Sequence, residues 1–178
     1  MKKQRSIVLF LVKFFATYFI LFALYSLYLQ NTQQKEDVFV CSPITTSVAE
    51  QTEAVLSFLG YDAAHMQHED EMSVKLLLNG HYTARVIEGC NSLSIIILFI
   101  SFIIAFPGSI KSTLLFGLFG SLFIYGINIL RIAFLTVMLY KYPDQQEFLH
   151  NLLFPAIIYG ATFLLWVVWV HKFSNYKK

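Results

Sequence analysis

The chain has 178 residues, of which 57% are hydrophobic and 13% charged, and its mean hydropathy is +0.60. An ordinary soluble domain is about 45–50% apolar and about 25% charged, so the composition excludes that class and indicates a membrane protein. The formal net charge of +2 is too small to indicate a nucleic-acid partner.

Four apolar segments are candidates for membrane spans. A spanning helix needs about 20 predominantly apolar residues, and the first segment, 7–29, contains one charge, Lys13. It exceeds the apolar core of about 7–15 residues of a signal peptide, and we find no convincing cleavage site. The second segment is short, and reaches spanning length if its helix starts near Cys90. The last three segments are 93–106, 113–140 and 152–170.

Basic residues predict the orientation of these spans, because short cytoplasmic loops and flanks carry an excess of Lys and Arg. The opposite side receives residues 30–89, with three basic residues against nine acidic ones, and the loop KYPDQQEFLHN. We therefore expect a multi-pass protein of the plasma or inner membrane with both termini in the cytoplasm. The basic residues expected on the cytoplasmic side are Lys2, Lys3, Arg5, Lys111, Lys172, Lys177 and Lys178.

The external segment is too long for a simple connection, since structureless loops beyond about 12–15 residues are uncommon. Its first part, SPITTSVAEQTEAVLSFLGY, is typical of a helix. Ser42 is a suitable N-cap, Pro43 suits the first helical position, and Gly60 lies just past the end. We expect this segment to fold outside the membrane.

A β-hairpin is predicted in SVKLLLNGHYTARVI, because Asn79 and Gly80 suit a type I′ turn between two β-prone arms. The expected fold is an all-α polytopic membrane protein of about four transmembrane helices, with a small extracytoplasmic α+β insert made of a helix and this hairpin. Its expected parts are 1–29, the cytoplasmic N-terminus and first span; 30–89, the insert; and 90–178, a three-helix transmembrane core.

Three polar residues are predicted to meet near the outer face of the membrane. Cys90 precedes the second span and His150 the fourth, both on the outer side. Arg131 lies about 18 residues, or roughly 27 Å, from the start of the third span and reaches the same level. A cysteine attacks as the thiolate, a cation favours that form, and an imidazole moves protons at neutral pH. Because a guanidinium also stabilises an oxyanion, the three residue types suit acyl transfer.

Three asparagines are candidates for binding substrate or orienting these groups. Asn128 lies one helical turn before Arg131 on the same face, where it would orient the guanidinium or bond a neighbouring backbone group. Asn151 is placed to orient the ring of the preceding histidine. Asn91 directly follows the cysteine.

The motifs around these residues resemble the exosortase/archaeosortase family of polytopic membrane cysteine transpeptidases. They are GCNSL (89–93), NILRI (128–132) and HNLLFPAIIYG (150–160), in the family's order of Cys, Arg and His. The resemblance covers roughly the C-terminal half, and the compact size is most like the short F-type exosortases. Ser92 stands where many members have glycine.

The resemblance implies a mechanism and a class of partner. Cys90 would attack a peptide bond in the C-terminal sorting signal of an exported protein, forming a thioester that an amine or water resolves. Arg131 would hold the thiolate or the oxyanion, and His150 would protonate the leaving amine. Such signals combine a short motif, a transmembrane helix and a basic cluster, so the substrate would enter sideways from membrane lipid. No cofactor is implied.

Other readings of the same residues remain open. Cys41 is the only other cysteine, and both cysteines lie on the oxidising side, where a Cys41–Cys90 disulfide would form readily. The chain would then be a non-enzymatic membrane assembly or scaffold protein. A small transporter is disfavoured, since no inverted repeat is visible. HMQHED resembles a set of metal ligands, but two histidines beside acids are usually a solvated face, so we expect no metal site.

Overall fold

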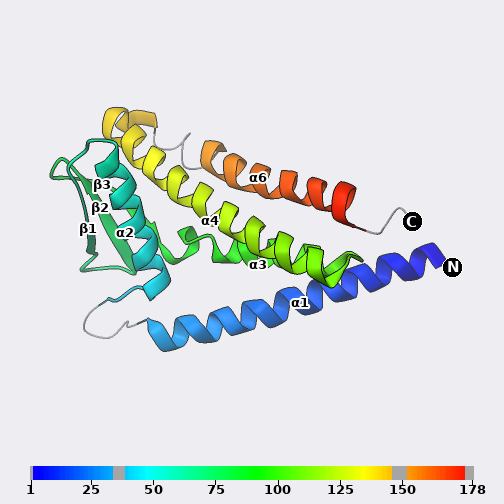
Figure 1. Cartoon of the computed structure of the whole chain (residues 1–178). Helices are drawn as coiled ribbons and strands as arrows, with labels where there is room; N and C mark the ends of the chain where they lie inside the picture. The colour runs from blue at the N-terminus through cyan, green and yellow to red at the C-terminus, as the bar shows by residue number, and fades with distance from the viewer. Residues whose placement is uncertain (1, 34–38, 146–151, 175–178) are drawn as a thin grey trace.

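The computed structural model describes residues 2–33, 39–145 and 152–174. It is mostly helical, with a small sheet at one end (Figure 1). The helices are α1 (Lys2–Thr32), α2 (Pro43–Phe58), α3 (Leu93–Ala105), α4 (Ile110–Lys141) and α6 (Phe154–Val168). The strands are β1 (Ala63–Gln67), β2 (Ser73–Leu78) and β3 (His81–Ile87), and the short helical turns are η1 (Glu88–Cys90), η2 (Pro143–Gln145) and η4 (Trp169–Phe173).

Among the described residues, three helices are long and apolar enough to cross a membrane: Gln4–Thr32, Ile110–Lys141 and Pro155–Phe173. The fourth expected span, α3, has 13 residues, or about 20 Å at 1.5 Å per residue, which is short of the hydrocarbon thickness. Its expected start near Cys90 is wrong, because the helix begins at Leu93. The chain is therefore a membrane protein with three full-length candidate spans and one shorter apolar helix.

The membrane helices pack around large apolar side chains. Phe99 and Ile103 of α3, Ile124 of α4, Ile158 of α6 and Trp169 form one buried cluster. Most other large apolar side chains of the long helices are exposed, as expected of surfaces that contact lipid tails rather than water.

The helix and the hairpin of the insert are confirmed. Ser42 is the N-cap of α2, where its hydroxyl accepts from the Thr45 N–H, and Pro43 is the first helical residue. Asn79 and Gly80 both have positive φ, 51° and 77°, as a type I′ turn requires. Local chemistry alone determines these two elements.

A third strand, β1, was not expected. It pairs antiparallel with β2, so the sheet has the order β1-β2-β3. Its sequence, AAHMQ, has no β-branched residue and only weak strand propensity. The strand forms because the loop after α2 passes beside the hairpin, which is a tertiary effect.

The insert packs against the end of α4 that is farthest from the α1 N-terminus (Figure 1). Val48 of α2 and Val74, Leu76 and Val86 of the sheet form a buried cluster with Ile132 of α4. Because Ile132 is the neighbour of Arg131, this core holds the sheet directly beside the predicted site.

Candidate active site

Cys90 lies between the sheet and α3, at the end of the 3₁₀ turn η1. Its thiol is free and half-buried. Ser92 adopts a left-handed conformation with φ 63°, and α3 follows at once. The thiol therefore lies at a sharp corner where the end of β3 turns into a membrane helix.

Asn128 binds the backbone at this corner. Its side-chain amide donates a hydrogen bond of 2.7 Å to the Cys90 carbonyl oxygen, and only 1% of Asn128 is exposed. The expectation that Asn128 bonds a neighbouring backbone group is borne out by this contact. A buried amide on α4 thus holds the cysteine residue of a separate element.

Arg131 lies three residues after Asn128 on α4, on the same face. Its half-buried guanidinium interacts with the Cys90 side chain and, electrostatically, with Tyr159 of α6. Cys90 lies 38 residues before Asn128 and 41 residues before Arg131 in the sequence, so it is tertiary folding that brings thiol and guanidinium together.

These residues line one cavity of about 660 Å³. Strand β3 forms one side, α4 another, and Pro155, Ile158 and Tyr159 of α6 a third. Cys90, Asn128 and Arg131 all contribute to the lining. Its size lies within the range of about 300–1,000 Å³ typical of ligand sites.

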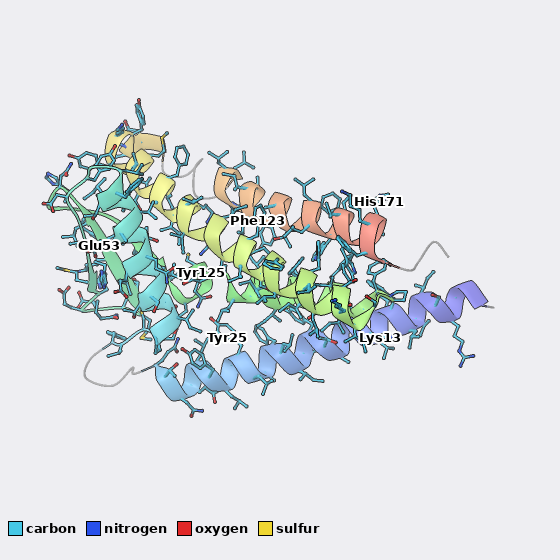
Figure 2. All side chains as sticks on the ribbon, in the orientation of Figure 1. Lys13, Tyr25, Glu53, Phe123, Tyr125 and His171 are labelled. Carbon is cyan, nitrogen blue, oxygen red and sulfur yellow. The ribbon has the colours of Figure 1, made fainter. Side chains whose placement is uncertain are left out.

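Asn91 lies away from the cavity. Its amide donates to the Tyr25 hydroxyl (2.8 Å) and to the Thr45 hydroxyl (3.1 Å), and its carbonyl oxygen accepts from the Leu93 N–H (3.0 Å). Tyr25 projects from α1 toward the rest of the bundle (Figure 2). Asn91 therefore joins α1, α2 and the start of α3, and the structure shows no substrate-facing role for it.

Glu88 is a contributor that the sequence analysis missed. Its carboxylate accepts from the Ser42 N–H (2.6 Å) and hydroxyl (2.8 Å), and also from the Thr45 hydroxyl. A carboxylate at a helix N-terminus is favoured by the free N–H groups and the helix dipole. Glu88 thus fastens the η1 turn to the start of α2, and the only sequence signal was an acidic residue beside the cysteine.

Ser92 is strained and buried. Its φ of 63° lies in the left-handed region, which costs a non-glycine residue roughly 1–2 kcal/mol. The residue is 2% exposed, and its hydroxyl has no hydrogen-bond partner among the described residues. The backbone conformation explains physically why glycine suits this position.

Cys41 is an inert thiol within the insert core. It is 2% exposed, the Gln67 amide donates to its sulfur at 3.7 Å, and burial raises the pKa of the thiol. Both cysteines are free thiols, so the alternative of a Cys41–Cys90 disulfide is contradicted by the structure. Cys41 contributes packing to the insert.

Two predicted site residues, His150 and Asn151, lie outside the described residues. In the HMQHED segment, the ligand atoms of His68, Glu69 and Asp70 lie within 4.8 Å of one another and are largely exposed. Glu69 binds Lys75 of the sheet. His68 in turn contacts Glu71 at 3.3 Å.

Comparison with known proteins places the chain in a family. The family model described as transmembrane exosortase (Exosortase_EpsH) matches residues 6–169. No curated protein and no solved structure matches the chain. The match extends beyond the C-terminal motifs to α1 and the insert, and the chain belongs to the transmembrane exosortase family.

Proposed function

We propose that this exosortase is a membrane cysteine protease or transpeptidase that cleaves the C-terminal sorting signals of exported proteins. One observation carries the proposal: Cys90 and Arg131 line the same cavity and interact, while Asn128 holds the Cys90 carbonyl. A thiol beside a buried guanidinium, in a cavity large enough for a peptide, suits nucleophilic attack on a carbonyl group.

The proposed reaction has two steps. The Cys90 thiolate adds to the scissile carbonyl carbon, and the Arg131 guanidinium stabilises the oxyanion that forms. The C–N bond then breaks, the leaving amine takes a proton, and a thioester remains on Cys90. His150 is the proposed donor of that proton. An acceptor amine or water attacks the thioester, loses a proton, and releases the thiolate with the transferred or hydrolysed product.

The proposed substrate carries a recognition motif, a transmembrane helix and a basic cluster, and reaches the site from the lipid. We place the site on the extracytoplasmic side of the plasma or inner membrane, with both termini in the cytoplasm. Basic residues near the chain ends and near Lys111 support this orientation. An F-type subtype remains part of the proposal.

The test compares Cys90→Ala and Cys90→Ser with the parent chain in the native cell. Membrane fractions are examined by mass spectrometry for exported proteins that retain their C-terminal transmembrane helix. We expect both variants to accumulate such uncleaved proteins, and Arg131→Ala to do so as well, since each removes a reacting or stabilising group. Cys41→Ala is the matched control and should process normally, because its thiol is buried outside the cavity.

Thiol labelling with a membrane-impermeant maleimide checks the nucleophile directly. Intact cells of the parent chain should label at Cys90, and Cys90→Ala should lose that label, because Cys41 is buried in the insert. Normal processing in Cys90→Ala, with the variant present in the membrane, would rule out the proposed activity.

A further inference from the structure

Strand β3 lies at the edge of the sheet and beside the cavity. In the order β1-β2-β3 it has one neighbour. Among the residues that the structure describes, its backbone pairs only with β2. An edge strand has a row of N–H and C=O groups that point away from the sheet and can pair with another chain.

The hydrogen bonds at both ends of β2 show which of its residues face β1. The His68 N–H donates to the Ser73 carbonyl (2.9 Å), and the Asn79 N–H donates to the Asp62 carbonyl (2.6 Å). Backbone groups alternate in direction along a strand. The odd-numbered residues of β2 therefore turn their N–H and C=O groups toward β1. The even-numbered residues of β2 turn their N–H and C=O groups toward β3.

The register of β3 then shows which of its residues point outward. Val74 lies opposite Val86, and Leu76 lies opposite Ala84, so Val86 and Ala84 turn their backbone groups toward β2. Arg85 lies between them and turns its N–H and C=O away from the sheet. The register shift next to Leu76 leaves one additional residue in β3, a bulge of the kind often found beside active sites.

The cavity follows this outward edge. Four consecutive residues of β3, 82–85, line it together with Gly89 and Cys90. Successive side chains of a strand point to opposite faces of the sheet, so a cavity that meets four in a row lies along the strand edge. The unpaired edge and the nucleophile thus share one space.

We propose that this edge binds the substrate by strand addition: an extended segment of the exported protein, next to its scissile bond, pairs its backbone with β3 at Arg85. The inference rests on the proposed function and describes how that site binds its peptide substrate. Main-chain pairing supplies affinity for an extended peptide, and pockets for alternate side chains supply selectivity. Because β3 leads directly into η1, a peptide along this edge is delivered to Cys90.

A proline scan of the two outer strands tests the proposal. Arg85→Pro removes an N–H that β2 does not use, and proline is tolerated on edge strands. Processing is followed by pulse-chase, on the exported protein that accumulates uncleaved in Cys90→Ala cells. We expect at least a tenfold slower rate in Arg85→Pro. The matched control, Ala63→Pro, changes an outward position of β1, away from the cavity, and should stay within twofold of the parent chain.

Arg85→Ala distinguishes the contribution of the Arg85 backbone N–H from that of its side chain. It removes the ion pair between Arg85 and Glu71 but keeps the N–H, so its loss should be clearly smaller than that of Arg85→Pro. An equal loss in both variants would assign the effect to the guanidinium and overturn strand addition, as would a parental rate in Arg85→Pro. If Cys90→Ala accumulates no uncleaved protein, the proposed function fails and this inference with it.

Disulfide crosslinking keeps the proposal testable if Arg85→Pro does not fold. Arg85→Cys is introduced into the Cys90→Ala chain, and single cysteines are scanned through the substrate residues that flank the cleavage point. Strand addition predicts crosslinks at alternate substrate positions. Crosslinks at every third or fourth position would show a bound helix, and that pattern, or no crosslinks, would overturn the proposal.

Discussion

Cys90 is held by buried polar contacts from two directions. Asn128 binds its carbonyl from α4, while Glu88, two residues before it, and Asn91, directly after it, bind the start of α2. A buried polar network whose members are satisfied makes a site rigid. The chain therefore holds the proposed nucleophile in place before any substrate is bound.

Asn128→Ala should loosen this arrangement. The Cys90 carbonyl loses its partner inside the protein, which costs about 1–3 kcal/mol, and processing should fall because the thiol is no longer held beside Arg131. Thermal unfolding in detergent and the processing assay measure the two effects. Thr136→Ala is the matched control, since its buried hydroxyl bonds only its own helix at Ile132. Equal processing losses in both variants would show a general stability effect instead.

Ser92→Gly should stabilise the protein. Glycine relieves the positive φ and removes a buried hydroxyl without a partner, a gain of about 1 kcal/mol. Asn79→Gly is the comparison, because Asn79 also has a positive φ of 51° but tolerates that conformation better than serine. The melting temperature of each variant measures the gain. A lower melting temperature for Ser92→Gly would contradict the strain argument.

At the scale of elements, α3 and α4 approach closely at one glycine. A Cβ added to Gly120 would lie 2.3 Å from the Phe99 ring, whereas one added to Gly126 would meet nothing within 4 Å. Small residues allow membrane helices to pack without a hydrophobic driving force. The contact keeps the short α3 beside a helix that is long enough to span the bilayer.

Gly120→Ala should therefore destabilise the helix pair by about 1–3 kcal/mol, because the Phe99 ring must move. Gly126→Ala is the matched control and should be neutral or gain roughly 0.5–1 kcal/mol from the better helix propensity of alanine. Thermal unfolding in one detergent compares them. Similar losses in both variants would mean that close packing at Gly120 is unimportant.

The hairpin of the insert should weaken in acid. Hydrogen bonds from Lys75 and Arg85 hold the pKa values of Glu69 and Glu71 below their usual range. Carboxyls with lowered folded-state pKa values stabilise the fold above the unfolded value of about 4.3, and this contribution is lost as the pH falls below it. Hydrogen exchange of hairpin amides against pH measures the loss, which Glu71→Gln should reduce. Each exchange rate is divided by the intrinsic rate at the same pH, and protection that stays constant or rises in acid would contradict the assignment.

At the scale of the whole molecule, the long helices separate two ends. The α1 N-terminus and the turn before α4 lie at one end, and α2 with the sheet lies at the other (Figure 1). The cavity lies at the sheet end, because β3 forms one of its sides. Finding the side of the membrane on which either end lies therefore gives the orientation of the whole molecule.

Two single cysteines in a Cys41→Ala, Cys90→Ala chain test the proposed orientation. Phe58→Cys, at a residue that is 90% exposed, should react with an impermeant maleimide in intact cells. Lys111→Cys, at the start of α4 and at the opposite end of the molecule, should react only after the membrane is opened. The reversed pattern would place the cavity in the cytoplasm and contradict the proposed access to exported substrates.

The sequence by itself determined the features that depend on local chemistry and on hydrophobicity. The long apolar runs, the cap at Ser42 and the turn at Asn79 and Gly80 each follow from a few neighbouring residues. The motifs around Cys90, Arg131 and His150 identified the family, which the match over residues 6–169 confirms. A span in lipid requires a long run of apolar residues, and a type I′ turn requires two residues that tolerate positive φ. Both requirements can be read directly from the residue order.

Only the tertiary structure decided how the site is built. Strand β1 has little strand propensity of its own and forms by pairing with β2, and the contacts of Glu88 join residues that are 46 positions apart. Asn91 resembled a site residue because it follows the cysteine, yet its side chain turns to Tyr25 on α1. Such contacts depend on how whole helices and the sheet pack, which residue order alone does not specify, so the shape of the cavity and its strand edge emerge only in the folded chain.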